Sequence, residues 1–422
     1  MKALCLFCLM FTGLLHASTL VSDNLSLGAH DIDRENSFLV ISDIHLNVSK
    51  FQPKMVFAPK KSSQQNDLDR ETFAILISTL TAEVASGKIA KPKFILLLGD
   101  LVGHQRQRLH AVSESEHVVF ESLKKAFPET PVFYLFGNND SFVGDYGPFR
   151  NTDASERLRS PLDVLRLTWP QGRFLSSGIL CKRTFWTYPC LLQSKTTNGY
   201  YAAYLAPNLR LLSLNSVMFS RYSSKNNGPS DDQLKWLETQ LAIAESKHES
   251  VLIAMHVPPG KNVYRSWFGD RAAFWRDDLS ERFVNLLQEH SSVVIGVLAA
   301  HTHKDELKVV QKKGKPLTGI YLNAALSTSH GNAPSIRSYK LRYQRPNWNL
   351  VDYQTYYFTK DASEVVALQS LYEFRTIYCR KDEESMTACL ANVTPAKMQR
   401  FFSAGNDKHF EKIRAPQNIY IK

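Results

Sequence analysis

Short apolar runs alternate with helical patterns along most of the chain. The runs that suit strands lie at 38–41, 94–98, 132–136, 211–214, 251–255 and 293–300. Such short runs, separated by polar and helical segments, are typical of strands in buried sheets. The alternation predicts an α/β fold made of stacked βα units.

Two helices are predicted between these strands. The first has apolar residues at helical spacing, namely Phe73, Leu76, Ile77, Leu80 and Val84. Gly87 is expected to end it, because glycine commonly follows the last turn of a helix. The second is expected to start at Ser230 as its N-cap, with Gln233 three residues later. It should bury Leu234, Leu237 and Leu241 and lead into the strand before His256.

The last third of the chain has a different pattern. After Asp305 it becomes strand-rich and aromatic, with Tyr339, Tyr353, Tyr356, Tyr357 and Phe358 at its centre. Aromatic rings usually pack in cores, so that is their expected role, and platforms that stack nucleobases are the alternative. From about Ala362 the chain is expected to be helical. We therefore expect a main domain at 18–360 and a small C-terminal extension at 361–422 that packs on it.

Polar residues follow five of the predicted strands, where each strand ends. They are SDIHL with Asp43 and His45, GDLVGH with Asp100 and His104, GNND with Asn138, Asn139 and Asp140, MHVPPG with His256, and AHTHKD with His301 and His303. In open α/β sheets such strand ends share one edge, where ligands bind. Two carboxylates, an amide and at least four imidazoles are therefore expected to meet at one place.

This set of side chains predicts a metal site. Imidazole, carboxylate and amide groups without a thiolate suit zinc, manganese or iron. Seven ligands exceed the needs of one tetrahedral ion, whereas two ions about 3.5–4 Å apart can share a bridging carboxylate. Asp100 is the expected bridge. Each motif alone is weak, but five in order, each after a strand, make coincidence a poor explanation.

The order D-x-H, GDxxxH, GNxD, HxPPG, HTHxD resembles the calcineurin-like metallophosphoesterases, and among them the acid sphingomyelinase-like phosphodiesterases. Further matches lie at 198–216 (NGYYAAYLAPNLRLLSLNS), 233–241 (QLKWLETQL) and 331–339 (GNAPSIRSY). The resemblance extends from about residue 38 to 358. It implies a four-layer αββα sandwich with a metal site at its rim, a catalytic domain at 18–360, and a metal-dependent phosphoesterase activity.

The resemblance also assigns roles to residues. One metal ion is expected on Asp43, His45, Asp100 and His303, and the other on Asp100, Asn138, His256 and His301, with zinc as the expected metal and manganese or iron as alternatives. His104, four residues after Asp100, is expected to face the phosphoryl group, where it stabilises charge or protonates the leaving oxygen. Its alternative role is that of an ordinary surface or core histidine.

Asn139 departs from the family pattern. The sphingomyelinase-like branch usually has a histidine there, as a second candidate acid, and an amide cannot donate a proton and recover it near neutral pH. Loss of general acid help costs about 10²–10⁴ in rate when the leaving group is poor. Anhydride leaving groups hardly need that proton. Endopolyphosphatases share GNND by resemblance, so Asn139 is expected to mark a change of substrate class.

Two other departures concern Ala300 and the N-terminal region. Glycine is usual at the position of Ala300, and a small effect is expected if the backbone there is ordinary strand. Acid sphingomyelinase has a saposin-like module before its catalytic domain, and only about twenty residues lie between Ser18 and Phe38. A membrane lipid substrate is therefore less expected than a soluble one.

The N-terminal residues predict export. Lys2, an apolar run at 3–15 and the small residues Ala17 and Ser18 match a secretory signal peptide at 1–17, and a membrane anchor would need about 20 apolar residues. Outside that segment four cysteines remain. Short spacing favours the pairs Cys181–Cys190 and Cys379–Cys389, which an oxidising compartment would preserve. A zinc knot is less favoured, since CxxC spacing is absent. Periplasm, extracellular space and a lysosome-like lumen all stay open.

The formal net charge of +11 suits an anionic substrate, although charge alone favours a basic surface that aids solubility. The leading hypothesis is therefore hydrolysis of soluble phosphodiesters or phosphoanhydrides such as nucleotides or polyphosphate. Sphingomyelin hydrolysis is the alternative, and it predicts an aromatic cage for which Trp186, Tyr188 and Trp267 are candidates. A metal-bearing protein that only binds anions is a second alternative. Nucleic acid is not an expected partner, since no reader motif occurs.

Overall fold

The structure is a computed structural model that describes residues 34–49, 67–104, 108–149, 160–168, 181, 188–195, 198–223, 228–262, 273–360, 365–402 and 420–421. The chain divides into two compact units, Met1–Ile32 and Asp33–Lys422, and all described residues belong to the second. The predicted signal peptide at 1–17 lies outside the described residues.

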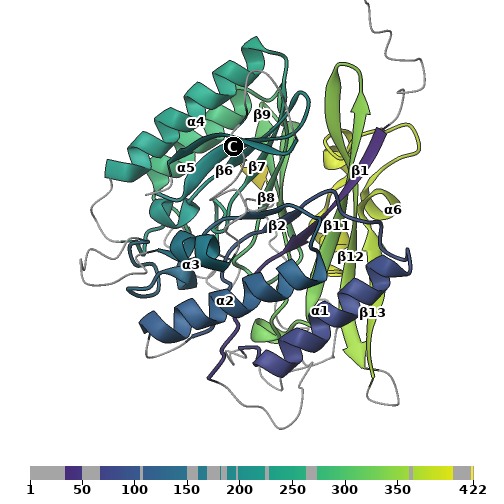
Figure 1. Ribbon diagram of the computed structural model, residues 1–422. Coiled ribbons are helices and arrows are strands. Elements are labelled where there is room, and N and C mark those ends of the chain that lie inside the picture. Colours follow the sequence, from purple (N-terminus) through teal and green to yellow (C-terminus); the bar gives the residue numbers. More distant parts are fainter. Residues whose placement is uncertain are drawn as a thin grey trace, which may run out of the picture. The chain divides into compact units, whose positions relative to one another are not determined.

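Two mixed sheets form the centre of the second unit (Figure 1). The six-stranded sheet has the order β13-β12-β11-β1-β2-β3, with bounds Val366–Glu373, Asn347–Lys360, Ser335–Gln344, Arg34–Ile41, Ile95–Leu97 and Val132–Tyr134. The eight-stranded sheet has the order β14-β9-β10-β8-β7-β6-β5-β4, with bounds Tyr420–Ile421, Glu306–Lys312, Lys315–Leu322, Val294–Ala299, Ser250–Ala254, Leu209–Ser213, Tyr200–Ala206 and Cys190–Lys195. In the first sheet β1, β2 and β3 are parallel, and in the second β6, β7, β8 and β10 are parallel.

Both faces of the central strands are buried, which explains their unbroken apolar sequence. In β1, Phe38 belongs to a buried cluster with Leu252 of β7, in the opposite sheet. Its neighbour Leu39 points the other way and belongs to a cluster with Phe73 of a covering helix. Successive side chains of a strand point to opposite faces, so one apolar run supplies two cores.

Helices cover the outer face of each sheet. The bounds are Arg70–Ala85 for α1, Arg108–Ala126 for α2, Pro161–Thr168 for α3, Gly228–Ser246 for α4 and Asp277–Glu289 for α5. Figure 1 shows α1 and α2 along the six-stranded sheet and α4 and α5 along the eight-stranded sheet. The predicted α/β class and four-layer αββα arrangement are thus confirmed. The first predicted helix is α1, with Asp69 as its N-cap and Gly87 just past its end at φ 80°.

The prediction for the second helix was wrong at its start. It is α4, which already begins at Gly228, so Ser230 is not its N-cap. The Ser230 hydroxyl instead donates to the carbonyl of Met218 (3.0 Å). The Gln233 amide donates to the backbone carbonyl of Asn215 (3.0 Å) and accepts from its N–H (2.8 Å). Both side chains therefore fasten α4 to the loop after β6. The same residue types at the same spacing would also suit a helix cap, which is why the sequence misled.

The prediction of helix from about Ala362 was wrong for its first part. Residues 366–373 form strand β13, which pairs with β12 at the edge of the six-stranded sheet, and the backbone groups on its inner side are met by that neighbour. Beyond it come the short helices α6 (Phe374–Tyr378) and α7 (Pro395–Gln399) and the 3-10 helix η6 (Ala388–Asn392), so a small helical extension is present. The division at residue 360 stays a prediction.

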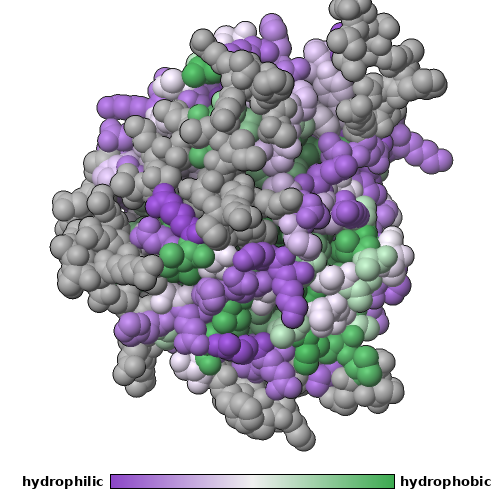
Figure 2. Space-filling model, viewed as in Figure 1, coloured by the Kyte–Doolittle hydropathy of each residue, from purple (hydrophilic) through white to green (hydrophobic). Residues whose placement is uncertain are grey.

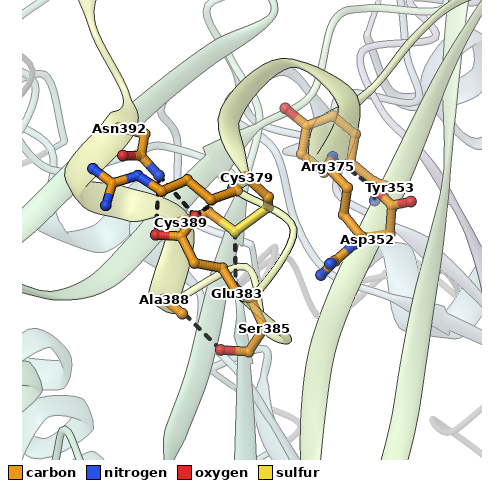
Figure 3. The surroundings of a disulfide bond; sticks show 10 residues. Asp352, Tyr353, Arg375, Cys379, Glu383, Ser385, Ala388, Cys389 and Asn392 are labelled. Carbon is orange, nitrogen blue, oxygen red and sulfur yellow. Dashed lines mark hydrogen bonds between the residues drawn. A yellow bond between two sulfur atoms is a disulfide. The ribbon is translucent and has the colours of Figure 1, made fainter.

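Both predicted disulfides are present, Cys181–Cys190 and Cys379–Cys389. The second closes the loop between α6 and η6 (Figure 3). Within that loop the amide of Asn392 donates to both carboxylate oxygens of Glu383 (3.0 and 2.8 Å). The zinc-knot alternative is excluded for these four cysteines, because a disulfide sulfur has no thiolate to offer a metal.

The rings at the centre of the strand-rich part mostly pack inside. Tyr339, Tyr353 and Phe358 are almost completely buried, so their expected core role is confirmed, while Tyr356 and Tyr357 are half-buried. Among the described residues, no helix is long and apolar enough to span a membrane. On the face in Figure 2 hydrophilic side chains predominate over α1 and α2, and hydrophobic ones form small separate patches. The outer helices are therefore amphipathic, as their sequences predict.

A buried polar cluster joins the two sheets beside the AHTHKD motif. The Oδ1 atom of Asp305, which directly precedes β9, lies 2.7 Å from Nη2 of Arg337 and accepts from the Tyr372 hydroxyl (2.7 Å). Its Oδ2 atom accepts from the Thr355 hydroxyl (3.0 Å). The Arg337 guanidinium also lies 4.0 Å from the ring centroid of Tyr353. This cluster fastens the loop after β8 to strands β11, β12 and β13.

We expect Arg337→Leu to lower the free energy of unfolding by about 3–5 kcal/mol, because it leaves the Asp305 carboxylate buried without its cation. Arg342→Leu is the matched control on the same strand, since Arg342 pairs with Glu35 on the surface and exposed pairs contribute about 0–1 kcal/mol. Urea unfolding of both variants checks this. Equal losses in the two would show that the buried pair adds no special stability.

Candidate metal centre

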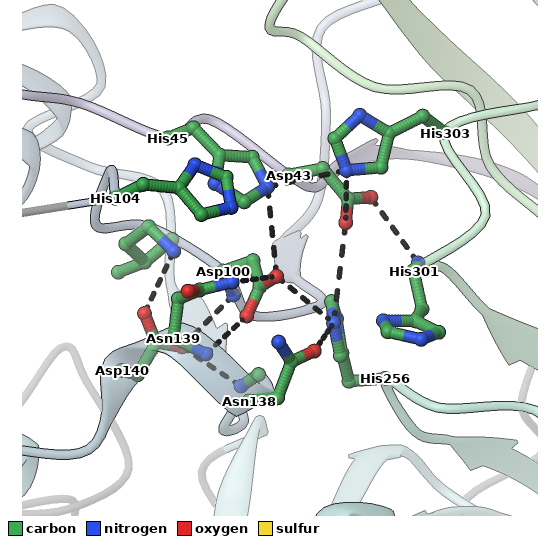
Figure 4. Close-up of polar contacts among 12 residues, drawn as sticks. Asp43, His45, Asp100, His104, Asn138, Asn139, Asp140, His256, His301 and His303 are labelled. Carbon is green, nitrogen blue, oxygen red and sulfur yellow. Dashed lines mark hydrogen bonds and ion pairs between the residues drawn. The ribbon is translucent and has the colours of Figure 1, made fainter. Parts of the chain in front are cut away.

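The five motifs end on one edge of the two sheets. Asp43 and His45 follow β1, Asp100 follows β2, Asn138 lies in the 3-10 helix η1 (Asn138–Asp140) after β3, His256 follows β7, and His301 and His303 follow β8. Figure 4 shows their side chains converging on one place. The predicted meeting of these residues is thus found, and it follows from the parallel strands, whose C-terminal ends lie together.

The ligand atoms fall into two groups. In one, Asp43, His45 and His303 place ligand atoms within 4.8 Å of one another, and in the other Asp100, His256 and His301 do so. The Nε2 atoms of His45 and His303 face each other at 3.2 Å. Asn138 adds its Oδ1 atom to the second group, 3.1 Å from His256 Nε2. The two groups match the two ligand sets predicted from the sequence, whose metal-binding role stays a prediction.

Asp100 lies between the groups, where a bridging carboxylate would be. Its Oδ2 atom is 3.5 Å from His45 Nε2 and 3.4 Å from His256 Nε2. Burial alone would raise the pKa of Asp100, but the neighbouring His256 and His45 and the hydrogen bonds to its oxygens hold it well below its usual value. A permanently ionised carboxylate in this position suits two cations at once.

His256 is oriented by the backbone. Its Nδ1 atom donates to the carbonyl of Leu98 (2.7 Å), which leaves Nε2 to face Asp100 and Asn138. A backbone acceptor of this kind fixes the tautomer of a metal-binding histidine. The amide nitrogen of Asn138 likewise donates to Asp145 (2.8 Å), so its oxygen points into the centre. Both residues are held in the orientation that metal binding needs.

Burial sets the protonation of the other ligands. Desolvation lowers the pKa of His45 to about 4 and that of His301 to about 3. Both rings are therefore neutral at pH 7 and keep a lone pair for a metal. Burial raises the pKa of Asp43 to about 7, and its Oδ1 atom has no hydrogen-bond partner among the described residues. A buried carboxylate oxygen without a donor is compatible with a cation.

Five of the seven predicted ligands adopt left-handed backbone conformations. They are Asp43 (φ 48°), His45 (φ 47°), Asp100 (φ 52°), His301 (φ 77°) and His303 (φ 60°). Such a conformation costs a residue with a side chain about 1–3 kcal/mol, and it persists only where the surroundings enforce it. Its concentration at one place is the pattern of a functional site. Here it turns side chains from different loops toward a common centre.

The glycines of GDLVGH and GNND permit a close approach of two loops. A Cβ atom on Gly137 would lie 2.1 Å from the Asp100 backbone nitrogen, and one on Gly99 would lie 2.2 Å from the Gly137 nitrogen. Asp140 then fastens the loops, since its carboxylate accepts from the backbone N–H groups of Gly137, Asp100 and Leu101 at 2.8–2.9 Å. This clamp fixes where Asp100 stands.

Glu116 of α2 lies beneath this clamp and is fully buried. No described donor contacts either of its carboxylate oxygens. Burial, with the nearby charge of Asp140, raises its pKa well above the usual value. The folded protein therefore keeps the Glu116 proton, whereas the unfolded chain releases it above pH about 4.5. The stability that the Glu116 carboxyl group contributes is therefore fully present at low pH. It is lost as the pH rises toward the pKa that Glu116 has in the folded protein.

We expect Glu116→Gln to be stability-neutral near pH 4 and increasingly stabilising at higher pH. The difference from the wild type should grow by up to about 1.4 kcal/mol per pH unit, which is the cost of keeping one proton that the unfolded chain would lose. Denaturant unfolding of both proteins from pH 4 to 8 measures it. A difference independent of pH would show that Glu116 titrates normally in the folded state.

His104 is held by a carboxylate that the sequence did not single out. Its Nδ1 atom donates to Asp67 Oδ1 (2.9 Å), and its backbone N–H donates to Asp67 Oδ2 (2.8 Å). The ring stacks on His45 with centroids 4.8 Å apart. Burial lowers the pKa of His104, but the bond and charge of Asp67 outweigh this and raise it. The sequence offers one signal for Asp67. It is a carboxylate just before α1, but Asp69, not Asp67, is the N-cap of that helix.

Asn139 touches the predicted bridge directly. Its backbone N–H donates to Asp100 Oδ1 and its amide nitrogen donates to Asp100 Oδ2, both at 2.8 Å. The amide oxygen is buried without a partner among the described residues. Asn139 thus orients the Asp100 carboxylate with two donors. It offers no proton that could be exchanged with a substrate.

Other residues around the centre also escaped the sequence analysis. The Tyr146 hydroxyl lies 3.1 Å from His301 Nε2. Asn332 donates to the carbonyl of His303 and also contacts Lys304, whose ammonium donates to its Oδ1 atom (3.2 Å). The His330 ring lies edge-on to that of His303, with centroids 4.7 Å apart. Tyr146 and His330 lie outside the motifs, and the motifs that contain Asn332 and Lys304 do not assign these contacts, so only the fold reveals them.

The candidate aromatic cage for sphingomyelin does not form around Tyr188. This ring packs on Tyr204 (centroids 6.2 Å) and precedes β4. Since β4 runs in the same direction as β6 and β7, its start lies at the edge opposite the metal ligands. Trp186 and Trp267 lie outside the described residues.

The chain was compared with known proteins. The family model described as calcineurin-like phosphoesterase matches residues 37–305. Sphingomyelinase phosphodiesterase D of Dictyostelium discoideum is 25% identical over 68% of this chain and 60% of its own length. The cyclic GMP-AMP phosphodiesterase of Rattus norvegicus is 23% identical, over 76% of this chain and 71% of its own. The acid sphingomyelinase-like phosphodiesterase 3b of Mus musculus is 25% identical, over 86% and 81%.

The match extends over well more than half of the chain, and the fold of this family implies a dinuclear metal site. The buried imidazoles of His45 and His301, neutral at pH 7, and the ionised Asp100 carboxylate fit such a site. The resemblance of GNND to endopolyphosphatases stays a prediction. The chain belongs to the calcineurin-like phosphoesterase family, with acid sphingomyelinase-like phosphodiesterases among its relatives, as its motif order predicted.

Proposed function

We propose that this protein is an exported, two-metal hydrolase of phosphodiester or phosphoanhydride bonds in soluble anionic substrates, such as nucleotides or polyphosphate. The observation that carries the proposal is the convergence of two ligand groups on Asp100, whose Oδ2 atom lies 3.5 and 3.4 Å from a histidine of each. Two-metal hydrolysis of phosphate esters uses ions held about 3.5–4 Å apart, and a carboxylate between two ligand groups suits such a pair.

The roles of the residues follow from their positions. One ion would bind Asp43, His45, Asp100 and His303, and the other Asp100, Asn138, His256 and His301. Zinc is the metal that we propose, because imidazole supplies four of the seven side chains. The ions would supply an activated hydroxide and neutralise charge on the phosphoryl oxygens. His104 would hold a proton near the leaving oxygen, oriented by Asp67.

Asn139 bears on the substrate class. Asn139 donates two hydrogen bonds to Asp100 and has no proton to give to a substrate. We therefore assign His104 as the group that protonates the leaving oxygen. A single acid favours substrates whose leaving group needs little protonation, as in anhydrides. The net charge of +11 favours the same polyanionic substrates. The two disulfides agree with an oxidising compartment outside the cytoplasm.

The test uses the purified protein, loaded with zinc or manganese, on four substrates: bis(p-nitrophenyl) phosphate, ATP, polyphosphate and sphingomyelin. Preference for ATP or polyphosphate supports the proposal. Preference for sphingomyelin favours the lipid alternative that the names of two relatives suggest. If metal binds but none of the four is cleaved between pH 4 and 8, the hydrolase proposal fails and the anion-binding alternative takes its place.

A further inference from the structure

We propose that Tyr146 and Tyr222 form a stacking subsite for a planar ring of the substrate, with a nucleobase as its occupant. This rests on the proposed function, since the subsite would serve the same metal centre. The ring centroids of the two tyrosines are 5.3 Å apart. Tyr146 contacts the predicted ligand His301, and Tyr222 packs on Tyr146.

Tyr146 is fixed to the metal centre at two points. Its backbone N–H donates to the carbonyl of Asn138 (3.0 Å), and its hydroxyl lies 3.1 Å from His301 Nε2. Its backbone is left-handed, with φ 53°. A residue with a side chain keeps such a conformation only where its surroundings enforce it. The position of this ring beside the second ligand group is therefore set by the fold.

Tyr222 is partly open to solvent but its backbone is anchored. Its side chain is 45% exposed, which is unusual for an aromatic ring beside a buried centre. Its N–H donates to the Ser220 hydroxyl (3.1 Å), and Ser220 forms a β-bridge with the fully buried Trp275. The neighbouring Arg221 N–H donates to the carbonyl of Phe274 (3.0 Å). The exposed ring is thus mounted on a rigid frame.

The contacts of these rings suit a nucleotide. The Tyr146 ring lies 6.2 Å from the ring of the predicted ligand His301 and 5.3 Å from the ring of Tyr222. A nucleotide carries its base on the sugar next to its phosphate, so a phosphate at the metal centre brings the base near these rings. Every base has a π-face that can stack on tyrosine without regard to sequence. Polyphosphate has no such ring, so the subsite would distinguish nucleotides among the anions.

A quaternary ammonium group is the competing occupant, because it also binds aromatic rings. One feature favours the base. The described part of the site offers two rings tilted by 54°, whereas a cage for an ammonium group surrounds it. The experiment separates these two occupants.

The test compares two substrates with the same leaving group, thymidine 5′-(p-nitrophenyl phosphate) and methyl p-nitrophenyl phosphate. Tyr222→Ala should raise KM for the thymidine ester roughly tenfold, at the low end of the loss expected for one stacking ring, and leave the methyl ester within about twofold. Tyr222→Phe keeps the ring and should restore the thymidine KM. Tyr343→Ala, which removes a half-buried ring packed on Trp348, is the matched control and should change neither.

Three results would overturn the subsite. They are equal losses on both esters, no loss on the thymidine ester, or a loss with p-nitrophenyl phosphorylcholine instead, which would assign the rings to an ammonium group. If the wild type cleaves no ester, adenosine is titrated into the metal-loaded protein and its Tyr146 and Tyr222 ring signals are followed by NMR. Shifts abolished by Tyr222→Ala would support the subsite whether or not the protein is a hydrolase, and absent shifts would overturn the subsite.

Discussion

Asp100→Asn is expected to lower kcat/KM by about 10³-fold or more on every phosphate substrate and to reduce bound metal from two ions per chain to one or none. An amide oxygen carries no charge, so it cannot neutralise two cations, and two-metal centres contribute several kcal/mol to transition-state stabilisation. The replacement has the same shape and can still accept from the backbone N–H of Asn139. Activity assays with metal analysis by mass spectrometry measure both effects.

The matched control is Asp231→Asn, which removes a carboxylate paired with Arg282 on the surface. It should leave activity and metal content unchanged. Circular dichroism and thermal melting show whether Asp100→Asn keeps the fold. If Asp100→Asn retained both metal ions and near-normal activity, Asp100 would not be the bridge and the assignment of the two ligand groups would have to be revised.

Asp67→Asn is expected to lower kcat by about 10²–10³-fold when the leaving group is poor, within the range for general acid catalysis. Asparagine cannot stabilise a protonated His104 as the carboxylate does, nor fix its tautomer with the same charge. With p-nitrophenolate, which needs little protonation, the loss should stay within about fivefold. Steady-state kinetics on methyl and p-nitrophenyl esters of the same phosphate measure the contrast.

The pH profile provides a second readout for Asp67. The carboxylate raises the pKa of His104, so the acid form persists to higher pH, and activity that depends on it is lost as the pH rises through that pKa. Removal of the charge should therefore move the alkaline limb of the profile to lower pH. A profile that stays in place would show that His104 does not supply the proton.

His104→Ala should cost about as much as Asp67→Asn, and the double variant should be little worse than either, because the two residues act as a unit. Asp69→Asn is the matched control two residues away. Asparagine caps a helix about as well as aspartate, so α1 and the activity should be preserved. Additive losses in the double variant would mean that Asp67 acts by some route other than His104.

Much of the architecture was predictable from local pattern. Runs such as 38–41 and 94–98 are apolar throughout because the strands are buried on both faces, and the polar motifs that follow them mark the strand ends. The seven predicted ligands could be found because each stands next to such a run. Prediction failed where one local pattern is compatible with two structures. Residues 366–373 were expected to be helical but form an edge strand. Ser230 and Gln233 were expected to cap a helix but fasten a loop.

The sequence by itself thus determined the α/β class, the edge of the sheets that carries the chemistry, the residue types gathered there and the two disulfides, because these depend on short-range periodicity and spacing. The four-layer arrangement came from the resemblance to a known family. The tertiary structure alone decided that Asp67 holds His104, that Asp140 clamps the loops around Asp100, that Asp305 joins the sheets and that Tyr222 stands beside Tyr146. These contacts join residues 32 to 76 positions apart that share no motif, and no local pattern encodes a distance of that kind.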